Sequence, residues 1–259
     1  MGTSASSKGP RSGISLDPPW LQSDPTNTDN LDRVAPARRF SYARRHLAEY
    51  IRTGNRQSLG KAIGHYSKHG MGGAKHIAKR MQLTASSAAQ IFGFFQEIRN
   101  PIELSLKAWV AAIKHRELSK YDLADHFVDK VLPLRGTLDE ESCRMSMDKA
   151  LIDLIEDNPN IDLFQLSDVD IWRVVTSFVR YEANERLNLD IGKKFEELSI
   201  TPMEIVERQS EMSDYLMAEL DAQIIRERNT ENNQAGMRID QMITRAVENT
   251  FMVFEEMLT

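Results

Sequence analysis

Two histidines four residues apart, His65 and His69, are the first residues in the sequence whose type and spacing could do chemistry. At this spacing two imidazoles share one face of a helix and can bind a metal ion. His76 lies nearby, but no glutamate follows His65 as in the zinc-protease pattern His-Glu-x-x-His, and Gly70 follows His69 directly. The pattern therefore favours a structural turn or surface histidines, and we expect neither a metal site nor a bound cofactor.

Two other local patterns fall short of a catalytic site. The segment from Gly54 to Lys61 resembles a phosphate-binding loop, but five residues rather than four separate Gly54 from Gly60. Neither Ser nor Thr follows Lys61, and a helical pattern rather than a strand precedes the segment. Cys143, the single cysteine, lies within a helical pattern without a flanking nucleophile signature. We therefore expect the chain not to be an enzyme.

The most reactive group is expected at Gly2, because a methionine before a small residue is normally removed. The α-amine has a pKa of about 7.7–8.0, against about 10.4 for lysine, so roughly a tenth or more of it is neutral and nucleophilic at neutral pH. The following residues are small enough to enter a deep pocket: Thr3, Ser4, Ala5 and Ser6. Gly2 with Ser6 also fits the N-myristoylation pattern, which we regard as the weaker use of Gly2.

Composition and charge limit the classes of protein to which the chain can belong. The 259 residues are 41% hydrophobic and 27% charged, as in ordinary soluble globular proteins. No apolar run approaches the roughly 18 residues that span a bilayer, and no secretory signal is recognisable. One cysteine excludes an internal disulfide, so a cytoplasmic location without a membrane partner is expected.

The net charge of −5 is unevenly distributed. Residues 1–80 carry 14 Lys/Arg and 5 Asp/Glu, whereas the remainder carries 19 Lys/Arg and 33 Asp/Glu. Arginines also recur every seven residues at Arg38, Arg45 and Arg52. A basic N-terminal region and an acidic remainder of the chain indicate nucleic-acid contact, charge-matched docking, or attraction between the two regions of one monomer.

The elements that must position these residues are helical. Residues 1–36 are mostly Ser, Thr, Gly, Pro, Asn and Asp, which bury too little apolar surface to offset their ordering entropy. From residue 37 apolar residues recur at helical spacing: a first helix is expected after Pro36 and to end at Gly54, and short helices are expected at about 58–68 and 74–81. Later helix starts are indicated by four capping patterns: Ser119/Asp122, Thr137/Glu140, Ser167/Asp170 and Thr201/Glu204.

No segment shows the alternation of a strand with hairpin turns. We therefore predict an all-α protein, an irregular multi-helix bundle of about nine helices preceded by a disordered N-terminal arm. The expected regions are an arm at 1–36, a basic short-helix region at 37–82 and an acidic helical body at 83–259. We expect residues 37–259 to form one domain.

Several short stretches in the first 80 residues occur in an order that resembles a known family: Met1-Gly2-Thr3-Ser4, Ser6-Ser7-Lys8-Gly9-Pro10, Pro18-Pro19-Trp20, Asp24-Pro25, Arg39-Phe40, Leu59-Gly60-Lys61-Ala62-Ile63-Gly64-His65-Tyr66 and Gly70-Met71-Gly72-Gly73. They resemble the start of the QatB family, the B component of the four-part bacterial Qat anti-phage defence system.

The resemblance implies a non-catalytic adaptor whose companions are an ATPase, a protein similar to the deazaguanine-synthesis enzyme QueC, and a TatD-like nuclease. By position it implies that Gly2 is the acceptor for an amide-linked deazapurine, with Thr3, Ser4, Ala5 and Ser6 in the cleft of the QueC-like partner. A possible interaction surface comprises Arg38, Arg45, Arg52, His65 and Tyr66. The alternative is a nucleic-acid-binding module that uses the basic helices of residues 37–82.

Overall fold

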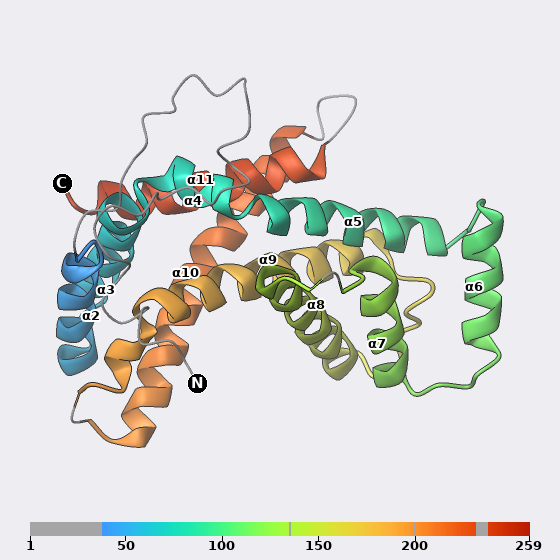
Figure 1. Ribbon diagram of the computed structural model, residues 1–259, viewed down its shortest axis with the longest axis horizontal. Helices are drawn as coiled ribbons and strands as arrows, with labels where there is room; N and C mark the ends of the chain where they lie inside the picture. The colour runs from blue at the N-terminus through green and yellow to red at the C-terminus, as the bar shows by residue number, and fades with distance from the viewer. Residues whose placement is uncertain (1–37, 135, 199, 232–237) are drawn as a thin grey trace. The chain divides into compact units, whose positions relative to one another are not determined.

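The computed structural model describes residues 38–134, 136–198, 200–231 and 238–259. Within these ranges the chain is all-α, as predicted, with ten α-helices, one π-helical turn, one 3-10 turn and no strand (Figure 1). The predicted arm at 1–36 lies outside the described residues. None of the described helices combines the length and hydropathy that crossing a membrane requires.

The elements follow in this order: α2 (Ser41–Thr53), α3 (Arg56–His65), the π-helical turn η2 (Tyr66–Met71), α4 (Ala74–Arg80), α5 (Gln82–Ile98), α6 (Leu104–Lys114), α7 (Lys120–Val131), α8 (Leu138–Asp157), α9 (Asp168–Ile191), the 3-10 turn η3 (Gly192–Phe195), α10 (Pro202–Glu231) and α11 (Ile239–Glu256).

Local side-chain chemistry sets the helix ends, and the predicted caps are confirmed. Gly54 ends α2 with a φ of 68°, and its N–H donates to the Tyr50 carbonyl at 2.7 Å. Before α8, Thr137 Oγ1 accepts from the Glu140 N–H, and Glu140 Oε2 accepts from the Thr137 N–H, both at 3.2 Å. Such pairs satisfy backbone N–H groups that the first helical turn leaves unpaired. Helices α7, α9 and α10 begin with related pairs: Ser119/Asp122, Ser167/Asp170 and Thr201/Glu204.

The described residues divide into two compact units. The first unit combines the chain up to Met81 with Asn184–Glu227 and Thr244–Thr259, and the second combines Gln82–Ala183 with Arg228–Ile243. Helices α9, α10 and α11 contribute to both units. The regions expected from the sequence are continuous stretches of the chain, whereas each unit joins segments that lie far apart in the sequence. The reason is that a helix packs against the apolar face that complements its own, wherever that face lies in the chain.

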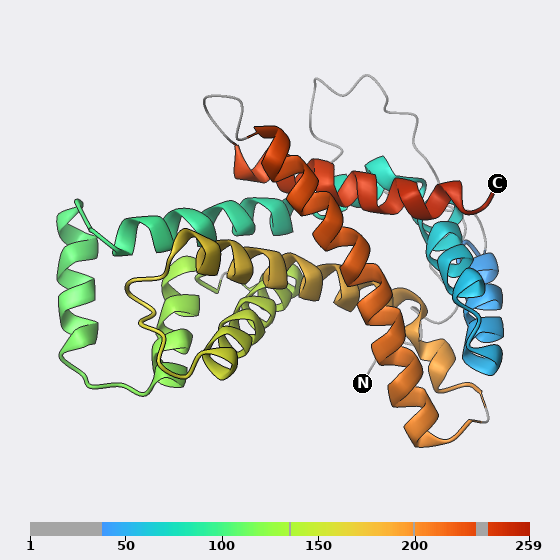
Figure 2. The same ribbon diagram turned by 180° about the vertical axis from the view of Figure 1, so that it is seen from behind.

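In the first unit α2 and α3 lie side by side, as the two opposite views agree (Figures 1 and 2). The apolar residues that recur at helical spacing along α2 are buried: Phe40, Ala43, Leu47, Tyr50 and Ile51. So are four apolar residues at helical spacing along α10: Met212, Leu216, Leu220 and Ile224. Tyr215 of α10 meets Phe254 of α11 edge to face, with ring centroids 5.4 Å apart. Apolar packing of these helices therefore builds the core of this unit.

Two glycines let α3 approach α11 closely. A Cβ at Gly60 would lie 2.6 Å from Met257 Sδ, and a Cβ at Gly64 would lie 2.2 Å from the Phe254 carbonyl oxygen. Both distances are below van der Waals contact. The spacing of four residues places the two glycines on one face of α3, and this face lies against the C-terminal end of the chain.

The sequence predicts a helix that ends near Lys68 and is broken by Gly70, Gly72 and Gly73, and the part of this prediction that concerns Gly70 is wrong. The chain continues from α3 as a π-helical turn to Met71, with Gly70 inside the turn, where its missing side chain admits the Phe40 ring. Gly72 then ends the turn with a φ of 84°, and Gly73 follows with a φ of 108°, a range that L side chains rarely adopt.

A carboxylate of α11 holds the start of α4. Glu255 Oε1 accepts from the Ala74 N–H at 2.8 Å and from the Ser67 hydroxyl. An anionic group at the first turn of a helix is stabilising, because it complements the unpaired N–H groups and the helix dipole. Glu255 therefore fixes the glycine-rich turn against the C-terminal helix.

The second unit is built on an apolar stripe of α9 at helical spacing, which is fully buried: Ile171, Val174, Val175, Phe178 and Val179. An aromatic cluster brings α5, α6, α7 and the segment after α8 together, with centroid separations of 5.3–5.9 Å: Phe94, Phe95, Trp109, Phe127 and Phe164. Most of these contacts are edge to face, the arrangement that the ring quadrupoles favour.

Candidate functional site

Four rings stack across α2 and the α3–η2 segment of the first unit. Tyr42 and His46 come from α2, His65 ends α3, and His69 lies in the π-helical turn. The ring centroids are 5.0 Å apart for His46 and His65, 5.2 Å for His65 and His69, and 5.4 Å for Tyr42 and His65. We call these four residues the Tyr–His stack.

The stack follows from helical spacing. Tyr42 and His46 are four residues apart, as are His65 and His69, so each pair lies on one face of its helix. Helices α2 and α3 lie side by side (Figure 1), and the rings of the two pairs meet across them. In the same unit the buried ring of Phe40 stacks on that of Tyr66, with ring centroids 5.7 Å apart.

The stack is partly exposed and surrounded by positive charge. Tyr42 is 55% exposed and His69 is exposed, whereas His46 and His65 are half-buried. The flanking cations are Arg45 and Lys68, both exposed, and the half-buried Lys61. One carboxylate lies close by: Glu49 Oε2 is 3.5 Å from His46 Nδ1. The arrangement offers aromatic faces next to cations.

Burial lowers the pKa of His65 to about 4, and the neighbouring cations and imidazoles add to this effect: His46, His69, Lys61 and Lys68. The His65 ring is therefore neutral at neutral pH. Among the described residues no group of three or more His, Cys, Asp or Glu is placed to hold a metal ion.

Acidification is expected to destabilise the protein through His65. The folded-state pKa lies below the ordinary value of about 6.5, so the unfolded chain binds the proton more tightly. Stability is therefore lost as the pH falls from about 6.5 towards 4, by about 1 kcal/mol once solvent screening of a half-exposed group is allowed for. Urea unfolding at neutral and acidic pH measures this loss.

The variant His65→Gln should lose less stability than the wild type between the two pH values. His115, which is exposed after α6, provides the matched control His115→Gln, which should behave as the wild type. An equal loss in the wild type and in His65→Gln would contradict the prediction.

The predicted interaction residues differ in how far the structure exposes them. Three are exposed: Arg38, Arg45 and Arg52. His65 belongs to the Tyr–His stack, whereas Tyr66 is only 2% exposed and donates its hydroxyl to Asp190 Oδ2 at 3.0 Å. Burial and Asp190 raise the pKa of Tyr66 well above its ordinary value. Tyr66 therefore supports this surface from the interior.

Tyr42 and His46 were not among the predicted residues, although their spacing repeats that of His65 and His69. The predicted acceptor Gly2 and its neighbours Thr3, Ser4, Ala5 and Ser6 lie outside the described residues.

The second unit contains a buried carboxyl group, that of Glu182, which is 0% exposed. Oε1 accepts from the hydroxyls of Ser142 at 2.7 Å and Ser146 at 2.9 Å. Oε2 accepts from the hydroxyl of Thr84 at 3.2 Å and the thiol of Cys143 at 3.6 Å. These four donors tie α9 to α5 and α8. The sequence signal was available, because Glu182 follows Phe178 by four residues on the apolar face of α9.

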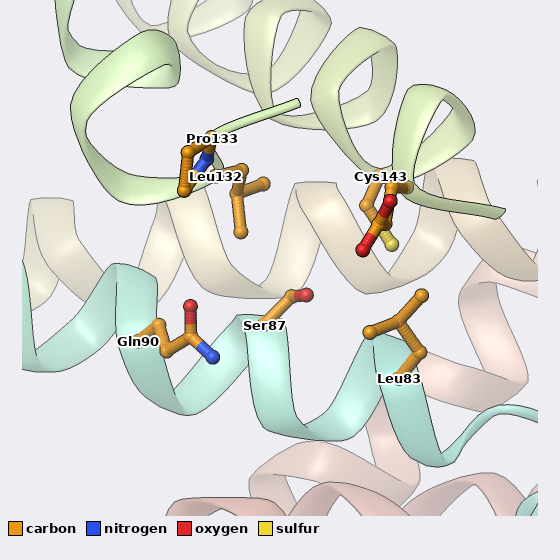
Figure 3. Close-up of a pocket in the computed structure, with 7 residues that line it drawn as sticks. Leu83, Ser87, Gln90, Leu132, Pro133 and Cys143 are labelled. Carbon is orange, nitrogen blue, oxygen red and sulfur yellow. The ribbon is translucent and has the colours of Figure 1, made fainter. Parts of the chain in front are cut away.

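A pocket adjoins Cys143 in this unit. Six of its lining residues come from α5, from the segment after α7 and from α8: Leu83, Ser87, Gln90, Leu132, Pro133 and Cys143 (Figure 3). The Cys143 side chain points from α8 towards α5. A thiol that donates to a buried carboxyl group is poorly placed as a nucleophile, because a thiolate there would be desolvated and repelled by a carboxylate.

Comparisons with known proteins identify the family. Neither the curated proteins nor the solved structures gave a match. A family model described as Qat anti-phage system associated protein QatB matches residues 72–254, well over half of the chain. The match covers the helices that follow most of the N-terminal stretches quoted above. The chain therefore belongs to the QatB family and is a component of Qat anti-phage defence.

Proposed function

We propose that this chain is a non-catalytic adaptor subunit whose Gly2, after removal of Met1, is modified by a QueC-like partner in the cytoplasm. Membership of the QatB family supports the part of this proposal that places the chain among the components of Qat anti-phage defence. The observation that carries the proposal is Gly2 itself, followed by the small residues Thr3, Ser4, Ala5 and Ser6. In this proposal those residues occupy the partner's cleft, and the ATPase and the TatD-like nuclease of the system act with the modified chain.

The proposed reaction joins a carboxylate to an amine. The partner uses ATP to convert the carboxylate of a deazapurine into an activated acyl group. The neutral nitrogen of Gly2 attacks the acyl carbon, the activating group leaves with the bonding electron pair, and the nitrogen loses one proton. The product is an amide, so the chain gains the mass of the acid less one water. The low pKa of an α-amine, about 7.7–8.0, supplies the neutral nucleophile that lysine side chains largely lack at neutral pH.

Exposed apolar side chains on the helical body support a role in docking partners. Ile102 and Leu104 at the start of α6 are 91% and 82% exposed, and Leu138 at the start of α8 is 90% exposed. Large aliphatic side chains are costly to leave in water and are stabilised when a partner covers them.

Mass spectrometry of the intact chain, produced with and without the QueC-like partner, tests the proposal. We expect a mass gain only when the partner is present. Trypsin releases residues 2–8, a peptide that carries both the α-amine of Gly2 and the side-chain amine of Lys8. Fragment masses should place the added group on Gly2.

Two variants test whether Gly2, rather than Lys8, is the modified residue. Gly2→Glu should retain Met1, remain unmodified and abolish phage protection, because a bulky second residue prevents removal of Met1 and obstructs the cleft. Lys8→Arg should keep the full mass gain, because it removes only the competing side-chain amine. An unmodified chain in the complete system, or full protection by Gly2→Glu, would refute the proposal. A myristoyl group on Gly2 would likewise refute it.

A further inference from the structure

We propose that the Tyr–His stack is a binding surface for single-stranded nucleic acid. In this proposal bases stack on Tyr42 and His69, and Arg45, Lys61 and Lys68 hold the backbone phosphates. The inference does not rest on modification of Gly2.

The exposure of the rings is the first argument. Rings that only pack two helices together are normally buried, as Phe40 and Tyr66 are in the same unit. Tyr42 is instead 55% exposed and His69 is exposed, although both contact other rings of the stack. An aromatic ring held by a neighbouring ring is a preformed platform for a base, and such stacking tolerates any base because every base has a π-face.

The local backbone is the second argument. His69 lies in the π-helical turn Tyr66–Met71, and π-helical turns inside helices occur frequently at functional sites. The turn is fixed on both sides, since Gly70 admits the Phe40 ring within it and Glu255 binds the Ser67 hydroxyl. The platform is therefore held by the core of the first unit.

Charge complementarity selects the ligand. Lys61 and Lys68 act electrostatically on His65, the exposed Arg45 precedes His46 in α2, and Glu49 pairs with His46. Phosphate groups of a polynucleotide are attracted to such a surface, and each contact releases bound counterions. Because His65 is neutral at neutral pH, the positive charge comes from lysine and arginine, and the attraction does not depend on protonation of that histidine.

A single strand fits this surface better than a duplex. In a duplex the bases stack on each other, so their faces are not available to Tyr42 or His69. An acidic peptide would satisfy the cations but would leave the exposed rings without a stacking partner.

Fluorescence anisotropy of the full-length chain with a labelled oligothymidylate of about 20 nucleotides tests the proposal at low salt, about 50 mM. Tyr42→Ala should weaken binding about tenfold, because it removes one stacked base. Tyr42→Phe keeps the ring and should stay within about twofold of the wild type. Tyr121 of α7 is 52% exposed, so Tyr121→Ala is the matched control and should bind as the wild type.

The salt dependence tests the phosphate contacts separately. Lys68→Ala should reduce the slope of log affinity against log salt by about 0.7, the value for one phosphate contact on a single strand. Lys107→Ala, at an exposed lysine of α6, should leave the slope unchanged.

Four results would overturn the proposal: no binding at low salt, equal binding of an abasic strand of the same length, an unchanged affinity in Tyr42→Ala, or an equal loss in Tyr121→Ala. Thermal unfolding of each variant confirms that it is folded, which is expected because the substituted side chains are exposed.

Discussion

Replacing Gly64 by alanine is expected to lower the free energy of unfolding by at least about 2 kcal/mol. The added Cβ would lie 2.2 Å from the Phe254 carbonyl oxygen and 3.0 Å from the carbonyl carbon. These are backbone atoms, so no side-chain rotation can relieve the overlap. Helix α3 and the end of α11 must move apart, which breaks the packing of the first unit. Chemical unfolding followed by circular dichroism measures the loss.

The matched control is Gly93→Ala in the middle of α5, where a Cβ would have no neighbour within 4 Å. There alanine should stabilise the protein by up to about 1 kcal/mol, because it favours the helix more than glycine does. Hydrogen exchange should locate the effect of Gly64→Ala in peptides from residues 56–71 and 244–259. A Gly64→Ala variant as stable as the wild type would contradict the close contact between α3 and α11.

Replacing Glu182 by alanine is expected to cost about 3–5 kcal/mol of stability. The substitution leaves a cavity in the second unit and removes the acceptor of the hydroxyls of Thr84, Ser142 and Ser146. Buried donors that lose their acceptor contribute an unfavourable desolvation energy, and the cavity adds to it. Thermal and denaturant unfolding of the full-length chain measure the loss.

Glu185→Ala on the same helix is the matched control, because Glu185 is exposed and should change stability by less than about 0.5 kcal/mol. If Glu182→Ala does not fold, Ser146→Ala tests one of the same hydrogen bonds at a cost of about 1 kcal/mol. Equal stability of Glu182→Ala and Glu185→Ala, or no cost in Ser146→Ala, would show that the buried hydrogen bonds do not hold this unit together.

Local chemistry made the helix ends and buried faces predictable. Thr137 and Glu140 form the capping box that their spacing predicts, and Gly54 ends α2 as expected. Such ends depend on backbone N–H and C=O groups within one turn, so a few neighbouring residues contain the whole signal. The buried stripe of α9 was predictable for the same reason, because helical periodicity places Val174 and Phe178 on one face.

The sequence by itself thus determined an all-α fold, the ends of several helices and their apolar faces. It did not determine which faces meet, because periodicity identifies a buried face without identifying its partner. Only the tertiary structure brought Tyr42 and His46 of α2 onto His65 and His69, placed Gly64 against Phe254, and surrounded Glu182 with donors from two other helices. These contacts join residues from about 20 to 190 positions apart, and packing of complementary surfaces selects such pairs.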